Sequence, residues 1–324
     1  MTANPELMLA DFLERIPKVE LHCHSDGTID PEMIRGLTTS EDLEEFAGAL
    51  AATYPVTSID QWMNVYSPAL KKFLDPMAQR LPLVVMAHAD RWRRQNVQYA
   101  ELFVSTILMG IADKGAMIEC FRNLRFQLNS MENGPKVNLV VCVGRGNRQK
   151  LANQVPRMLA LSKLGLITGV ALAGDERACS VRELQDCFSE IHDNGLGVEI
   201  HAGEFCGPES VRDALDFGRP HRLGHGVRAF EDPSIVDRLA ETGTHVEFCP
   251  TSNVRLGVIR SVEELPIRQA LEAGIEFSIN TDDPGVFQCS LTSEFRLVAE
   301  TFGLTEDDLG RISRNSLRAA FTSP

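Results

Sequence analysis

At 324 residues with 44% hydrophobic content, the chain can bury a large core, and an α/β barrel of this length can form one domain, so we expect a single domain over residues 1–324. The formal net charge of −13 disfavours nucleic-acid binding, because no basic surface is available to neutralise phosphates. The first residues lack a basic stretch followed by an apolar one, and no run approaches membrane-spanning length, so we expect a cytoplasmic protein without membrane contact. The eight cysteines form no CxxC pair and are expected to be free, mostly buried thiols.

In chain order, eight short apolar runs have the composition of buried strands. These runs are 19–24, 97–105, 137–145, 167–175, 199–204, 222–226, 245–253 and 277–283. Between them lie stretches with apolar residues at helical spacing, such as 180–195, 208–218, 232–243 and 265–274. Alternating strands and helices predict parallel pairing, and eight repeats predict a (β/α)₈ TIM barrel.

The region 31–96, between the first two runs, is longer than one barrel crossover needs, so extra helices are expected between strands 1 and 2. Its clearest helix is 58–73, where Ser58 can cap the first turn and Trp62 belongs to an apolar stripe at helical spacing. The stripe is typical of ordinary packing against a barrel. A second hypothesis is that this helix forms a wall or lid over the pocket.

Polar residues that suit metal chemistry close four of the runs. His22 and His24 alternate along a strand, so they face the same side, while His201 and Asp282 end the fifth and eighth runs. In a closed barrel these ends adjoin one mouth. Three imidazoles and a carboxylate suit one zinc ion per chain, although manganese and iron accept the same ligands.

A divalent cation lowers the pKa of bound water from about 15.7 to about 7, so no serine or cysteine nucleophile is needed. Glu204 can face the pocket as a proton shuttle; its alternative role is to cap the following helix. His225 can orient or deprotonate the attacking water, or can be a structural histidine. Asp282 and Asp283 are consecutive, so in extended geometry one can bind metal while the other contacts substrate or water.

Six motifs in order give the chain a resemblance to the adenosine deaminase family of metal-dependent amidohydrolases. They are PKVELHCHSDG (17–27), LAGDE (172–176), HAGE (201–204), RLGHG (222–226), CPTSN (249–253) and NTDDP (280–284). The resemblance covers nearly the whole chain. It implies a zinc-containing barrel that hydrolyses the 6-amino group of a purine and releases ammonia.

The resemblance also implies a role for each matching residue. His22, His24, His201 and Asp282 resemble the metal ligands, and His24 also lies where substrate binds. Glu204 resembles the acid that protonates purine N1, His225 the group that steers the attacking hydroxide, and Asp283 the partner of N7 and the hydroxide. Gly174 resembles the backbone donor to N3, and Asp26 the residue that holds the ribose 5′-hydroxyl.

For the substrate, Asp26 and the Gly174-Asp175-Glu176 element favour adenosine or a related adenine nucleoside, because adenine deaminases of the resembled family typically carry Glu at the position of Asp26. Free adenine and a modified adenosine, such as methylthioadenosine or aminodeoxyfutalosine, are alternatives. The run 167–175 contains no Lys, which disfavours an amidohydrolase with two bridged metals. A noncatalytic zinc- or nucleoside-binding protein is disfavoured, because it would have no need of Glu204, His225 and Asp283 together. The sequence does not indicate the oligomeric state.

Overall fold

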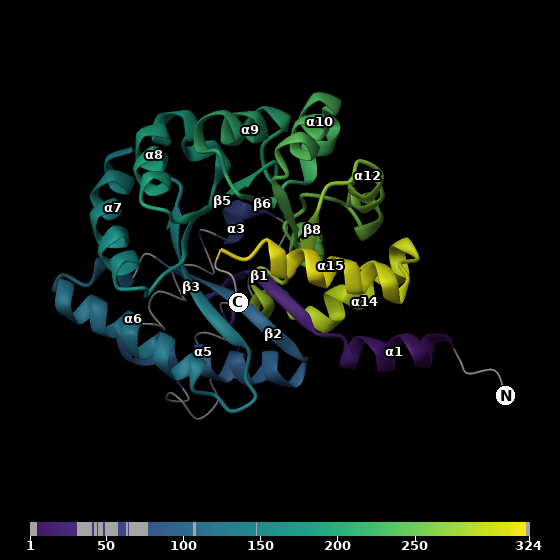
Figure 1. Ribbon diagram of the computed structural model, residues 1–324, viewed down its shortest axis with the longest axis horizontal. Coiled ribbons are helices and arrows are strands. Elements are labelled where there is room, and N and C mark those ends of the chain that lie inside the picture. Colours follow the sequence, from purple (N-terminus) through teal and green to yellow (C-terminus); the bar gives the residue numbers. More distant parts are fainter. Residues whose placement is uncertain are drawn as a thin grey trace.

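The computed structural model of the protein describes residues 5–30, 41, 44, 48, 58–62, 64, 77–105, 108–146 and 148–321. Eight parallel strands pair in chain order from β1 to β8, and helices surround them (Figure 1). The strands are β1 (Lys18–His24), β2 (Val97–Ser105), β3 (Lys136–Gly144), β4 (Gly169–Ala173), β5 (Gly197–Ala202), β6 (Arg222–His225), β7 (His245–Phe248) and β8 (Phe277–Ile279). This arrangement confirms the predicted (β/α)₈ barrel.

The barrel is closed between its first strand and the segment that follows its last strand. The amide of His24 donates to the carbonyl of Asp282 at 2.9 Å, and the amide of Asp282 donates to the carbonyl of His22 at 3.0 Å. Nearby, Glu20 accepts hydrogen bonds from the amide and the hydroxyl of Thr281. Closure therefore places the carboxyl ends of β1 and β8 side by side, as the predicted site requires.

The α-helices cover the outside of the strands or connect to them (Figure 1). They are α1 (Pro5–Arg15), α3 (Ile59–Gln61), α5 (Met77–Arg94), α6 (Lys114–Asn129), α7 (Arg148–Lys163), α8 (Gln185–Asp193), α9 (Pro208–Asp213), α10 (Pro233–Thr242), α11 (Pro250–Arg255), α12 (Ile267–Glu272), α13 (Pro284–Phe287), α14 (Leu291–Phe302) and α15 (Glu306–Arg318). Local sequence explains several helix ends: the Asp113 side chain caps α6, and Gly243 ends α10 in the left-handed region. Among the described residues, no helix combines the length and the apolar character that crossing a bilayer requires.

The predicted extra helices between strands 1 and 2 are present as α3 and α5. Of the expected helix 58–73, only residues 58–62 and 64 are described, and the remainder lies outside the described residues. Trp62 is partly buried, and its ring stacks on that of Phe287 with 5.9 Å between centroids. The stack places Trp62 against α13, the helix that begins directly after Asp283.

Several predicted strands are too long at their carboxyl ends. The run 245–253 leaves the sheet after Phe248, because Pro250 begins α11, and the run 277–283 leaves it after Ile279, shortly before Pro284 begins α13. The extended geometry expected for Asp282 is also wrong, because its φ is 62°. The polar residues of these two runs therefore lie beyond the strands at the mouth, where Asp282 forms an isolated parallel bridge with Cys23.

Apolar side chains form one large cluster and two small ones, one of which contains Val19, Leu21 and Tyr99. The large cluster lies between the strands and the helices, and it includes buried side chains such as Leu102, Val141 and Ile200. The other small cluster is formed by Phe103, Val140, Cys142, Ala171 and Ala173. The strands are thus buried on both faces, as parallel strands of a barrel are.

Candidate active site

Four predicted ligands, His22, His24, His201 and Asp282, lie together at the carboxyl ends of the strands. One side-chain donor atom from each lies within 4.8 Å of the others. Nε2 of His24 is 3.3 Å from Nε2 of His201 and 3.3 Å from Oδ1 of Asp282, and Nε2 of His22 is 3.5 Å from the same oxygen. Residues up to 260 positions apart in the sequence thus meet at one point.

These separations fit a metal ion. Tetrahedral bonds of about 2.0–2.1 Å, as in Zn–N coordination, place neighbouring donor atoms roughly 3.3 Å apart. Without an ion, the close approach of the His24 and His201 nitrogens would have to be a single imidazole–imidazole hydrogen bond, and Nε2 of His22 is a buried nitrogen without a well-formed hydrogen bond among the described residues. The convergence of these nitrogens and the Asp282 oxygen therefore forms a cluster that could hold a metal ion.

Buried carboxylates hold the opposite nitrogen of two of these imidazoles. Nδ1 of His22 donates to Glu247 at 2.8 Å, and Nδ1 of His201 lies 2.9 Å from Oε1 of Glu199. Glu247 in turn forms an ion pair with Arg222, and all three side chains of the His22–Glu247–Arg222 chain are fully buried. The Nδ1 proton that His22 donates to Glu247 leaves Nε2 of His22 with a free lone pair for a cation.

Burial and local charge set the protonation states of the cluster. Burial lowers the pKa of His24 to about 3 and that of His201 well below its usual value, so both imidazoles are neutral. Burial opposes a charge on His22, but the nearby carboxylates of Asp282 and Glu247 outweigh it and raise its pKa. Burial also opposes ionisation of Asp282, yet the neighbouring histidines hold the pKa of its carboxyl far below the usual range. The carboxylate is therefore ionised and ready to bind a cation.

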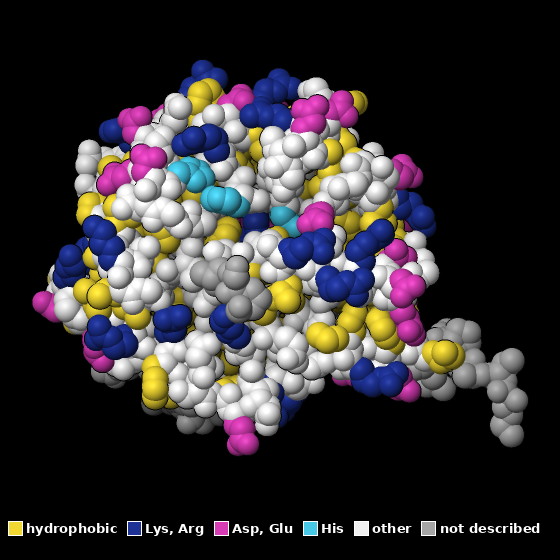
Figure 2. All heavy atoms as spheres, viewed as in Figure 1, with side chains coloured by type: hydrophobic (Ala, Val, Ile, Leu, Met, Phe, Trp, Pro, Cys, Tyr) yellow, Lys and Arg dark blue, Asp and Glu magenta, His cyan; other side chains and the backbone are white. Residues whose placement is uncertain are grey.

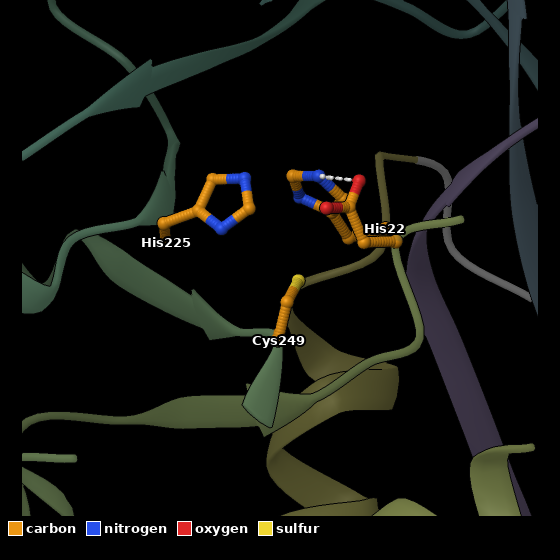
Figure 3. Close-up of side chains that lie close together, drawn as sticks. His22, His225 and Cys249 are labelled. Atoms are coloured by element: carbon orange, nitrogen blue, oxygen red, sulfur yellow. Dashed lines mark ion pairs between the residues drawn. The ribbon is translucent and has the colours of Figure 1, made fainter. Parts of the chain in front are cut away.

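A second possible ligand set overlaps the first. His22, His225, Cys249 and Asp282 also bring one donor atom each within 4.8 Å, and Figure 3 shows the Cys249 thiol beside the rings of His22 and His225. Burial raises the pKa of the Cys249 thiol well above its usual value, which keeps it protonated. Cys249 belongs to the CPTSN motif, but the sequence analysis gave it no role.

Glu204 and His225 lie beside this cluster. Glu204 is 3% exposed, and its Oε1 lies 3.7 Å from Nε2 of His225. Burial raises the pKa of the Glu204 carboxyl well above its usual value, and the charge of Asp282 reinforces this effect, so the protonated acid is favoured. The alternative role of Glu204 as a helix cap is wrong, because Gly207 precedes α9 and no side chain caps that helix.

The orientation of His225 depends on Asn253, a residue that the sequence analysis quoted only as part of a motif. The Asn253 amide nitrogen donates to Nδ1 of His225 at 3.0 Å, which leaves the proton on Nε2, facing the mouth. Burial lowers the pKa of His225 well below its usual value, so the ring is neutral. A neutral ring with a proton on Nε2 can donate a hydrogen bond to an attacking oxygen. Of the two roles expected for His225, this geometry supports orienting the water.

The two consecutive aspartates have different surroundings. Oδ2 of Asp282 accepts a hydrogen bond from the Ser252 hydroxyl at 2.6 Å, while Oδ1 faces the imidazoles. The Asp283 side chain lies against Gly27 so closely that a Cβ on Gly27 would be 1.6 Å from Oδ1 of Asp283. Burial raises the pKa of Asp283, and the charges of Asp282 and Asp26 raise it further. Gly27 therefore leaves the space that the Asp283 carboxyl occupies.

Asp26 and Gly174 occupy the rim. Asp26 is partly exposed two residues after β1, and Gly174 follows β4 with a φ of 90°, a conformation that favours glycine. A Cβ on Gly174 would lie 3.5 Å from the amide nitrogen of Arg145, so the backbone of the β3 and β4 loops is close together here. The Arg145 guanidinium donates to the carbonyl of His201 at 2.6 Å, which fixes the end of β5.

Glu176 is a positioning residue that the sequence analysis missed, although it quoted Glu176 within LAGDE. Its buried carboxylate accepts hydrogen bonds from the amides of Phe205 at 3.0 Å and Cys206 at 2.6 Å, and it lies 3.4 Å from the amide of Glu204. The loop that carries Glu204 is therefore held by Glu176, from the neighbouring β4 loop. A glutamate just after a predicted strand was the available signal, but its target could not be read from the sequence.

Both His225 and Asp282 have a positive φ, 60° and 62° respectively, and neither is glycine. Such conformations cost free energy and are retained where the surrounding structure fixes them, often at functional sites. His225 is the last residue of β6 and Asp282 follows the end of β8 by three residues, so both side chains lie at the mouth. The strain thus coincides with two of the predicted site residues.

Comparison with known proteins indicates the same family that the sequence motifs resemble. The family model described as Adenosine deaminase matches residues 17–324. An adenine deaminase of Rhizobium leguminosarum bv. trifolii is 34% identical over 321 residues, which cover 94% of this chain and 95% of that protein. Among solved structures, adenine deaminase from Arthrobacter aurescens matches with a TM-score of 0.81 and 23% identity over 95% of this chain and 94% of that one. A zinc-bound amidohydrolase from Burkholderia ambifaria matches with a TM-score of 0.74 and 20% identity over 97% and 88%. The two structures support the fold, and the family model and the Rhizobium relative show that the chain is an aminohydrolase of the adenosine deaminase family.

Proposed function

We propose that this protein uses one zinc ion, held by His22, His24, His201 and Asp282, to remove the 6-amino group of an adenine ring by hydrolysis. The observation that carries the proposal is the position of a buried carboxylic acid, Glu204, beside a cluster of three imidazoles and one carboxylate at the mouth of the barrel. A metal cluster alone would serve many hydrolases. A protonated acid next to it suits a substrate that must accept a proton on a ring nitrogen before water can add.

Zinc bound at this cluster would lower the pKa of water to about 7 and so supply the nucleophile at neutral pH. Glu204 holds its proton for purine N1, and this protonation makes C6 electrophilic. The Nε2 proton of His225 donates to the attacking oxygen and orients it. Asp283, whose pKa is raised by burial, donates to N7 or accepts from the attacking water, according to its protonation state.

Adenosine or a related adenine nucleoside is the first candidate substrate. Asp26 is partly exposed at the rim, where its carboxylate can accept a hydrogen bond from a ribose hydroxyl, and the Gly174 backbone lies at the neighbouring loop. Free adenine is the second candidate, because the curated relatives that are 30–34% identical over 94% of this chain carry the name adenine deaminase. In either case the substrate is a small purine. A cytoplasmic location stays a prediction from the sequence.

The test is to incubate purified, zinc-loaded protein with adenosine, deoxyadenosine, adenine and methylthioadenosine and to follow the ultraviolet change and ammonia release. We expect adenosine to have the highest kcat/KM. The highest value for adenine would replace the first candidate with the second while leaving the chemistry intact. Tight purine binding without ammonia release from any of the four would refute the proposed reaction. Metal analysis of the same preparation should give one zinc per chain.

A further inference from the structure

The C-terminal part of the described chain lies at the amino end of the barrel, opposite the proposed active site. In Figure 1 the C-terminus lies near the centre of the ring of helices, and Figure 2 shows histidine and basic side chains around this position in the same view. Leu317, Ala319 and Ala320 pack against Val19 and Tyr99, two residues near the starts of β1 and β2. The chain therefore continues from α15 across the floor of the barrel.

Phe321 enters the floor between two strands that begin with glycine. A Cβ on Gly169, at the start of β4, would lie 2.3 Å from Cδ2 of Phe321, and a Cβ on Gly197, at the start of β5, would lie 2.2 Å from its Cδ1. Any other residue at these two positions would exclude the ring. The ring also packs against the small apolar cluster that contains Phe103 and Ala171. Phe321 thus occupies a space that the barrel leaves for it.

Inside the barrel, Phe321 covers a buried arginine. Cζ of Arg222 lies 3.5 Å from the centroid of the Phe321 ring, which is cation–π distance. The backbone on either side of the ring joins the same network: the amide of Phe321 donates to Oε1 of Glu101 at 2.8 Å, and Arg222 donates to the carbonyl of Ala319 at 3.1 Å and to Oε2 of Glu101 at 2.6 Å. The C-terminal segment therefore covers Arg222 on the side that faces the amino end of the barrel.

The other side of Arg222 leads to the proposed metal centre. Its Nε forms an ion pair with Glu247, whose second oxygen accepts the Nδ1 proton of His22. The side chains of Arg222, Glu247, Glu101 and His22 are all fully buried, so water does not replace any of these contacts. A continuous chain of contacts thus runs from Phe321 through Arg222 and Glu247 to His22.

We propose that Phe321 is a positioning residue for the metal centre: by closing the floor of the barrel over Arg222, it fixes the Arg222–Glu247 ion pair and hence the orientation of His22. This inference rests on the proposed metal-binding role of His22. The physical reason is that the direction of a metal-binding imidazole is set by the acceptor on its other nitrogen, so whatever fixes Glu247 also fixes Nε2 of His22. Loss of the ring would admit water to Arg222 and let its guanidinium and Glu247 move.

The experiment measures zinc affinity in the full-length protein by chelator competition, together with the visible absorption spectrum of the cobalt(II)-loaded protein, which reports ligand geometry without any turnover. We expect Phe321→Ala to weaken zinc binding by about 10- to 100-fold, the usual effect of losing a group that supports a ligand, and to change the cobalt spectrum. Phe321→Tyr keeps the aromatic face, so it should retain native zinc affinity and the native cobalt spectrum. Phe321→Leu keeps apolar volume but not the face over Arg222, so it should lose zinc affinity several-fold, and it replaces the alanine variant if that protein does not fold.

Phe217 provides a matched control. Its ring also lies under an arginine, with Cζ of Arg182 at 4.4 Å, but on the outside of the barrel and without contact to the metal cluster. Phe217→Ala should therefore keep native zinc affinity and the native cobalt spectrum. In the background of Glu247→Gln, Phe321→Ala should cause little further loss, because both changes act on one chain of contacts.

Two results would overturn the inference: native zinc affinity in folded Phe321→Ala or Phe321→Leu, or the same loss in Phe217→Ala, which would indicate a general loss of stability. Both results are separable from failure of the proposed function. If the native protein binds no metal, the proposed function fails and the inference fails with it. If the native protein binds one zinc and the Phe321 variants bind it equally well, only the inference fails.

Discussion

Replacement of Glu204 by glutamine tests the acid role most directly. The side chain is 3% exposed and burial raises its pKa, which favours the neutral carboxylic acid, and glutamine matches that form in shape and charge. No buried charge is created or orphaned, and we expect the free energy of unfolding to change by less than about 1 kcal/mol. Proton donation, however, is lost. General acid catalysis contributes about 10²–10⁴-fold, so kcat should fall by this factor, which corresponds to roughly 2.7–5.4 kcal/mol of barrier.

The assay is the ultraviolet change on deamination of the preferred substrate, with bound zinc measured on the same sample. Glu209→Gln serves as the control, because Glu209 is an exposed glutamate five residues further along whose carboxylate accepts a hydrogen bond from the Gly207 amide. It should retain native kcat. A Glu204→Gln protein that keeps its zinc and turns over within about threefold of the native rate would refute the assignment of Glu204 as the acid.

The remaining predictions concern the metal, the rim and the core. His201→Ala should lose bound zinc, whereas Cys249→Ser should keep it; the reverse pattern in metal analysis would favour the overlapping cluster with the thiol. Gly27→Ala should lower kcat/KM with the fold intact by circular dichroism, because its Cβ would displace the Asp283 carboxyl; native kinetics would show that Asp283 is not needed in its present position. Burial raises the pKa of Glu294 to about 7, so the folded state binds more protons than the unfolded state between pH of about 4.5 and 7. As the pH rises through that window, the free energy of unfolding should therefore fall by about 3 kcal/mol. In denaturant titrations at several pH values, the free energy of unfolding of Glu294→Gln should not show this fall with rising pH. A pH dependence equal to that of the native protein would contradict the burial argument.

The sequence by itself determined the barrel and the identity of most candidate site residues. Strand residues alternate faces, so His22 and His24 had to point the same way, and eight strand-like runs separated by helical stretches had to pair in parallel. Glycine and proline marked where the chain turns, but two predicted runs, 245–253 and 277–283, continued past the strand ends at Phe248 and Ile279.

The tertiary structure alone decided how these residues are supported. Glu176, Asn253 and Glu247 belong to motifs or runs already noted, but their partners come from other strands, and such pairings leave no periodic signal in one sequence. The positive φ of His225 and Asp282 could not be foreseen, because local preference disfavours it and only the surrounding contacts maintain it. Phe321 lies 299 residues after His22 in the sequence, yet the closed barrel brings it to the floor beneath that histidine. The physical reason is that eight parallel strands leave an open amino end that some side chain must fill.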